Sequence, residues 1–234
     1  MLRGIKVKKS TMCDDIFFFD EMDFDKLDDK RMILLFGPNG AGKSTLLNQI
    51  ITSASNPDRS EIEVIRDQNR MSIYTYFNRT DNFRCRRSRS LAEEYDINML
   101  ADRFNANSVS EGQSIVYSVI DLLIGLTPGK KMFTVANGVQ SLVILDEIDS
   151  GLSIDNIDLF MRKIKNILKK RDDVQFIMSF NSPRVLKHFG QVISMYDGSV
   201  LNMRSEDDML EQINIHKVEF DKNRKMSDGR PRAL

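Results

Sequence analysis

A short segment in the first fifth of the chain combines glycines, a lysine and hydroxyl side chains at a spacing that suits phosphate binding. It runs Gly37, Pro38, Asn39, Gly40, Ala41, Gly42, Lys43, Ser44, Thr45, which fits the pattern G-x-x-x-x-G-K-[ST]. The glycines allow backbone N–H groups to converge on phosphate oxygens. The lysine reaches the β- and γ-phosphates and the first hydroxyl ligates Mg²⁺. The segment therefore predicts a site for a nucleoside triphosphate with Mg²⁺.

A second group of reactive side chains follows an apolar run much later in the chain. The run 142–145 ends in Asp146 and Glu147, the pattern of a Walker B element. Asp146 at the end of a strand is expected to hold Mg²⁺, directly or through water. Glu147 is expected to polarise the attacking water as a general base. Alone this pattern also fits a strand that ends at a polar rim, but together with the phosphate-binding loop it indicates hydrolysis.

The elements that must position these groups alternate between strand and helix. Strands are predicted over 32–36, 61–65, 71–77, 141–145, 174–179 and 192–195, and helices over 43–53, 154–170 and 206–218. Strand and helix in alternation predict an α/β fold with a mainly parallel sheet flanked by helices. In such sheets the ligand lies at the carboxyl ends of the strands, where both motifs occur.

Three segments together resemble the motifs of the ABC-type ATPases. Residues 37–45 resemble the phosphate loop, residues 109–113 the signature motif, and residues 145–147 with 150–152 the Walker B element and D-loop. The resemblance covers about residues 3–200 and implies a P-loop NTPase of the ABC-ATPase head type, with a small helical subdomain and an antiparallel β edge. It implies an ATPase domain over residues 1–204, with the helical and signature part at about 79–126, followed by a C-terminal helix and polar tail over 205–234.

The resemblance also implies a mechanism with ATP and Mg²⁺. Two heads form an ATP-dependent homodimer in which each ATP lies between one phosphate loop and the signature motif of the other head. Here the signature residues would be Ser110, Glu111, Gly112 and Gln113. In style the chain resembles the soluble branch of the family, the AAA-like, chromosome-maintenance and recombination-repair ATPases of bacteria and their phages. Residues 179–183 resemble the switch segment of that branch.

The chain departs from the family pattern at several functional positions. Glu111 stands where glycine is usual, and Asn181 stands at the position of the switch histidine. Asn181 can hydrogen-bond a phosphate or a water but cannot carry charge, which predicts slow hydrolysis. No clear Q-loop glutamine follows the strand 71–77, so Asn78 is the best positional substitute as a metal ligand, with Gln68 less favoured. The adenine-stacking aromatic of the family falls at Phe18, or at Phe17 beside it.

Five arginines raise the question of a nucleic-acid partner. They are Arg79, Arg84, Arg86, Arg87 and Arg89, and they fit either contacts to phosphates or a solvated basic face. The 234 residues have a net charge of zero, so the whole chain is not an obvious polyanion binder.

Composition also bears on the compartment. No apolar run approaches the roughly 18 residues of a membrane span. The chain has only two cysteines, so we expect it to reside in a reducing cytoplasm, which would be the host cytoplasm if the source is a virus. We expect no direct insertion into a membrane.

Three functions fit these features. The first is a stand-alone ATPase that remodels a nucleic-acid or protein complex. The second is a slow or non-hydrolysing ATP-gated dimerisation switch or regulator with a partner protein, which Glu111 and Asn181 favour. The third, less favoured, is the ATP-binding subunit of a membrane transporter.

Overall fold

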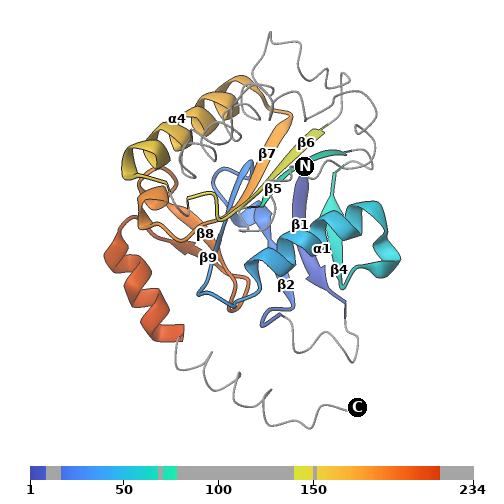
Figure 1. Ribbon diagram of the computed structural model, residues 1–234. Helices are drawn as coiled ribbons and strands as arrows, with labels where there is room; N and C mark the ends of the chain where they lie inside the picture. Colours follow the sequence, from blue (N-terminus) through green and yellow to red (C-terminus); the bar gives the residue numbers. More distant parts are fainter. Residues whose placement is uncertain (9–16, 68–70, 78–139, 150–151, 217–234) are drawn as a thin grey trace, which may run out of the picture.

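The computed structural model describes residues 1–8, 17–67, 71–77, 140–149 and 152–216. These residues form a six-stranded and a three-stranded sheet with helices packed on both faces of the larger one (Figure 1). The mainly parallel sheet with flanking helices predicted from the sequence is confirmed, together with an antiparallel component. Residues 79–126, where the helical and signature part is expected, lie outside the described residues.

The larger sheet has the strand order β5-β6-β7-β3-β8-β9. Its strands are β3 (Met32–Phe36), β5 (Met71–Phe77), β6 (Gln140–Asp146), β7 (Val174–Ser179), β8 (Gln191–Ser194) and β9 (Val200–Asn202). Neighbouring strands are parallel from β5 to β8, and only β9 is antiparallel to its neighbour. Because β6, β7 and β3 lie side by side and run in the same direction, their carboxyl ends meet at one edge of the sheet.

The smaller sheet is antiparallel, with the order β2-β1-β4. It consists of β1 (Leu2–Val7), β2 (Glu21–Asp23) and β4 (Ile62–Arg66). The buried Gln175 side chain of β7 joins the two sheets: its Oε1 accepts from the Leu2 N–H at 2.8 Å, and its Nε2 donates to the carbonyls of Leu2 and Lys30 at 2.9 and 2.7 Å.

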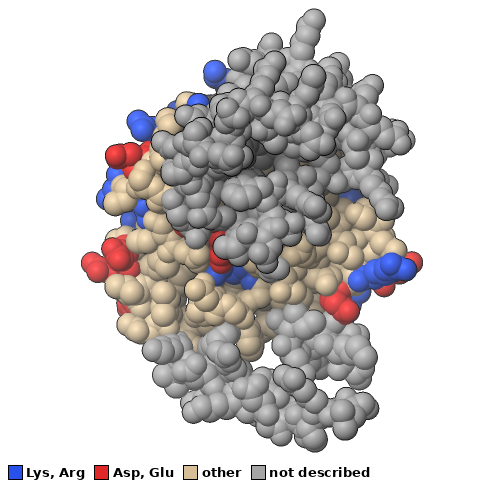
Figure 2. All heavy atoms as spheres, viewed as in Figure 1, with Lys and Arg blue, Asp and Glu red and all other residues tan. Residues whose placement is uncertain are grey.

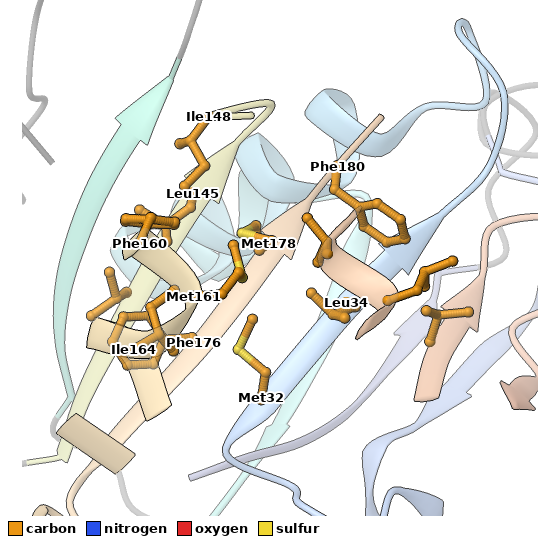
Figure 3. Packing of buried hydrophobic residues seen from close by; sticks show 14 of the residues in the cluster. Met32, Leu34, Leu145, Ile148, Phe160, Met161, Ile164, Phe176, Met178 and Phe180 are labelled. Carbon is orange, nitrogen blue, oxygen red and sulfur yellow. The ribbon is translucent and has the colours of Figure 1, made fainter. Parts of the chain in front are cut away.

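Alternating side chains of the central strands enter two separate hydrophobic cores. Leu34 and Val143 belong to the core under α4 (Ile154–Lys170), shown in Figure 3. Ile33 and Ile144 belong to the core under α1 (Lys43–Ser55) and the small sheet. The strands are buried on both faces, which explains their almost continuous apolar sequence.

The helices close the two faces of the larger sheet. The helix α4 presents Ile157, Phe160, Ile164 and Leu168 to its core, the face predicted from the spacing of these residues. Its N-cap Ser153 accepts a hydrogen bond from the Asn156 N–H at 3.4 Å. The described part of the chain also contains short 3₁₀ helices at Phe24–Lys26, Pro57–Arg59 and Pro183–Lys187, and its residues 206–216 form a further helix.

Candidate functional site

The loop between β3 and α1 is shaped by its glycines. At Gly37 a β-carbon would lie 2.9 Å from the β-carbon of Met195 and 3.0 Å from that of Ala41, so only glycine fits without movement. Gly40 and Gly42 have φ values of +87° and +85°, in the left-handed region that favours glycine. Gly42 is the N-cap of α1, so the loop ends at a helix N-terminus, where backbone N–H groups and the helix dipole favour an anion.

Lys43 lies folded across this loop. Its side chain is only 4% exposed, and its Nζ donates to the carbonyl of Gly37 at 2.8 Å and to that of Pro38 at 3.2 Å. Burial lowers the pKa of Lys43, and the nearby carboxylates of Glu147, Asp146 and Asp149 oppose that shift. The ammonium group is thus held inside the loop, within electrostatic reach of three acids at or just after the carboxyl end of β6.

The carboxyl end of β6 carries two adjacent acids in different environments. Asp146 is 2% exposed, and its Oδ1 accepts a hydrogen bond from the Ser179 hydroxyl at 2.6 Å. Glu147 is partly exposed and has a φ of +49°. Its N–H donates to the same Ser179 Oγ at 2.9 Å. A positive φ in a residue other than glycine costs roughly 1–3 kcal/mol and is found preferentially at functional sites.

A third acid connects this strand end to the next. Asp149 is buried, and its Oδ2 accepts hydrogen bonds from the N–H groups of Asn181, at 2.8 Å, and of Ser182. Burial raises the pKa of Asp149, whereas the hydrogen bonds from Ser182 and Asn181 lower it. Within the described part of the chain, Oδ1 of this carboxylate has no hydrogen-bond partner. The carboxylate fixes the segment after β7 beside the end of β6.

The structure therefore brings together some of the residues singled out in the sequence. Lys43 lies within electrostatic reach of Asp146 and Glu147, and Asp149 holds the backbone of Asn181 to the same edge. The substitute metal ligand, the arginines and the signature residues predicted for the site or for partners lie outside the described residues: Asn78, Arg79, Arg84, Arg86, Arg87, Arg89, Ser110, Glu111, Gly112 and Gln113.

The three phenylalanines before β2 have different exposures. Phe17 and Phe19 are 6% and 5% exposed and belong to the core under α1, while Phe18 between them is 38% exposed. An exposed ring is what stacking on a base requires, so Phe18 rather than Phe17 remains the candidate for that contact.

The donor set at the loop suits Mg²⁺ bound together with a nucleotide. Ser44 lies in the first turn of α1 and Asp146 at the end of β6. Among the described residues, His, Cys, Asp and Glu form no cluster of three that could hold a metal. Mg²⁺ is usually bound by one or two protein ligands together with phosphates and water. Ser44 and Asp146 fit that role.

Sequence reasoning did not assign a role to two residues of this edge. Asp149 could have been found because it is a third acid closely following Asp146 and Glu147. Ser179 could have been found because it ends a buried apolar strand next to the Walker B strand. Neither signal says which atoms the side chain contacts, and that information came from the structure.

The charges of the described residues are mixed on one face of the molecule. On the face shown in Figure 2, acidic and basic side chains of the described residues are interspersed around the rim rather than gathered by sign.

None of the described helices has the length and apolar character needed to span a lipid bilayer.

Comparisons with known proteins agree with this geometry. A family model described as "AAA domain" matches residues 26–187. No curated protein matches the chain. The fold is similar to cbiO1 from Clostridium perfringens, described as part of the ABC transporter complex cbiONQ, with 16% identity, 97% of this chain and 99% of that chain covered, and a TM-score of 0.54.

A second similar structure is the dimeric MJ0796, described as a bacterial ABC transporter cassette. It has 15% identity, 87% of this chain and 98% of that chain covered, and a TM-score of 0.51. A further structure of MJ0796 is described as a post-hydrolysis state bound to ADP and Pi, with 16% identity, 87% and 98% coverage and a TM-score of 0.50. The chain therefore has the P-loop NTPase fold of the ABC ATPases.

Proposed function

Because the chain belongs to the AAA domain family over residues 26–187, we propose that it is an ABC-type ATPase of the soluble branch. In this proposal it binds and hydrolyses ATP, dimerises around ATP, and drives remodelling of a nucleic-acid or protein complex. The observation that carries the proposal is the position of Lys43, buried in a glycine-shaped loop and facing the carboxylates at the end of β6.

ATP binding follows from the loop. The triphosphate would take the place in front of the N-terminus of α1, where phosphate oxygens accept from backbone N–H groups and from Lys43. Lys43 would then exchange its bonds to the carbonyls of Gly37 and Pro38 for stronger bonds to an anion. Ser44 and Asp146 would hold Mg²⁺, which would neutralise part of the phosphate charge. The exposed ring of Phe18 would stack on the adenine.

Hydrolysis depends on the two residues that flank the expected γ-phosphate position. Glu147, partly exposed, would accept a proton from the attacking water as a general base. Asn181, exposed at the start of the segment held by Asp149, would donate a hydrogen bond from its amide to the phosphate or orient the water. Since an amide carries no charge, turnover is expected to be slow compared with a site that contains histidine.

Dimerisation is proposed from the resemblance to the ABC-type ATPases. Ser110 and Gly112 of one head would complete the ATP site of the other, so bound ATP would stabilise the dimer and hydrolysis would release it. The arginines between residues 79 and 89 are the proposed contacts to a nucleic acid. The neutral Asn181 also favours a second candidate, an ATP-gated switch that turns over slowly and acts on a partner protein.

The test is ATP binding and phosphate release with two lysine variants. Lys43→Met keeps the length of the side chain but removes the charge, and it should abolish both ATP binding and hydrolysis. Lys170→Ala changes an exposed lysine at the far end of α4 and should behave as the wild type. Equal ATP affinity in the Lys43 variant and the wild type would refute the proposed site, and binding without hydrolysis in the wild type would favour the switch.

A further inference from the structure

Ser179, the last residue of β7, is fully buried and contacts both acids at the end of β6. Its Oγ donates to Asp146 Oδ1 at 2.6 Å and accepts from the Glu147 N–H at 2.9 Å. A serine hydroxyl has one proton to donate, and here it goes to Asp146. The N–H of Glu147 therefore meets a lone pair of the same oxygen, so one atom sets the positions of two residues.

These two contacts act beside a residue with an unfavourable backbone conformation. Glu147 has a φ of +49°, a conformation that a residue other than glycine adopts only when its surroundings hold it there. The hydrogen bond from its N–H to Ser179 is one such restraint, and it fixes the direction in which the Glu147 side chain leaves the strand. The bond to Asp146 fixes which carboxylate oxygen of that residue remains available to other ligands.

Pairing of the strands does not require this hydroxyl. The strands β6 and β7 are already joined by backbone pairing from Ser141 with Val174 to Leu145 with Met178. Ser141, at the opposite end of β6, is also buried, at 1% exposure, and within the described residues its hydroxyl has no hydrogen-bond partner. A buried serine in this sheet can therefore lack a hydrogen bond from its hydroxyl, whereas the Ser179 hydroxyl forms hydrogen bonds with both Asp146 and Glu147.

We propose that Ser179 is a positioning residue for ATP hydrolysis, acting through Asp146 and Glu147. This inference rests on the proposed function. It assigns Ser179 no contact with the nucleotide: the hydroxyl orients the carboxylate that would hold Mg²⁺ and the backbone of the residue that would activate water. Partners of this outer kind typically change metal affinity or activity by about 10- to 100-fold when removed.

Three variants test the proposal: Ser179→Ala, Ser179→Thr and the matched control Ser141→Ala. For each, kcat and KM for ATP are measured, together with the Mg²⁺ concentration that half-saturates the Mg²⁺-dependent part of ATP binding. Ser179→Ala should lower kcat about 10- to 100-fold and raise that Mg²⁺ concentration, with metal-free ATP binding within about twofold of the wild type. Ser179→Thr, which keeps the hydroxyl, should recover most of both losses, and Ser141→Ala should match the wild type.

Two results would overturn the assignment. One is an unchanged kcat and Mg²⁺ requirement in Ser179→Ala. The other is an equal loss in Ser141→Ala, which would mean that any buried serine of this sheet matters only for folding. If the wild type does not hydrolyse ATP, the proposed function fails in its catalytic part, and the Mg²⁺ concentration for ATP binding still decides the role of Ser179.

Discussion

Replacing Gly37 by alanine should destabilise the protein because the loop after β3 packs tightly against Met195. The added β-carbon would lie 2.9 Å from the β-carbon of Met195 and 3.0 Å from that of Ala41. Neither atom is the flexible end of a side chain, so the backbone itself must shift. Overpacking of this kind costs about 1–3 kcal/mol, a large fraction of the roughly 5–15 kcal/mol that stabilises a typical domain.

Gly40→Ala provides the contrast, because a β-carbon there meets nothing within 4 Å and only the φ of +87° opposes it. A left-handed conformation costs a residue with a β-carbon about 1–2 kcal/mol. The two variants are distinguished by adding Ala41→Gly, which removes one of the close contacts at residue 37 and leaves those to Met195. Combined with Gly37→Ala, Ala41→Gly should restore part of the lost stability, with a coupling energy of about 0.5–3 kcal/mol. Combined with Gly40→Ala, it should restore none.

The assay is urea denaturation, with the midpoint and the slope fitted for each variant. ATP affinity is measured on the same samples and should fall in Gly37→Ala, because the shifted backbone carries the N–H groups that we propose bind the phosphates. The reasoning is refuted if Gly37→Ala unfolds within about 0.5 kcal/mol of the wild type, the spread of neutral surface changes, or if Ala41→Gly shows no coupling with it.

Three further predictions concern side chains around the site and the core. Phe18→Ala should weaken ATP binding with little change in stability, because its ring is exposed, whereas Phe19→Ala should cost about 3–5 kcal/mol on urea denaturation, because its ring is buried. Gln175→Leu should cost about 2–4 kcal/mol in the same assay, since it removes the side-chain hydrogen bonds of two buried backbone groups of Leu2 and of the partly buried Lys30 carbonyl. Hydrogen bonds from Arg184, the larger effect, and from His188 lower the pKa of Asp158 below its usual value. The ionised Asp158 carboxylate therefore stabilises the folded state at a pH above its unfolded pKa of about 4. This stabilisation is lost as the pH falls towards the pKa of the folded state. The stability difference between the wild type and Asp158→Asn should accordingly be present at pH 7 and shrink in acid, and a difference independent of pH would contradict this.

Much of the fold was predictable because the local signals agree with the tertiary structure. The helix Ile154–Lys170 and the strand Val174–Ser179 have the predicted bounds: one has a clear amphipathic period and the other a short apolar run between polar residues. The mainly parallel sheet followed from the alternation of such elements. The pairing order of the strands and the union of the two sheets by Gln175 depend on contacts distant in sequence, which local patterns do not encode.

The candidate site was predictable to a different degree. The loop 37–45 has a defined pattern because only certain residues can wrap a phosphate, so its position was evident in the sequence. The sequence did not predict the left-handed backbone of Glu147 or the contacts of Ser179 and Asp149. Serine and aspartate occur at many strand ends for unrelated reasons. Their roles depend on which strand lies next to β6.

The most direct test of the proposed ATP-dependent dimer is the molar mass of the Glu147→Gln variant, measured by light scattering with and without Mg-ATP. The amide keeps the size of the side chain and removes its capacity to accept a proton, so bound ATP should persist. We predict that the mass doubles when Mg-ATP is added and that Lys43→Met in the same variant prevents the doubling. A mass that stays at the monomer value at saturating Mg-ATP would contradict the proposal that two copies of this chain close around ATP.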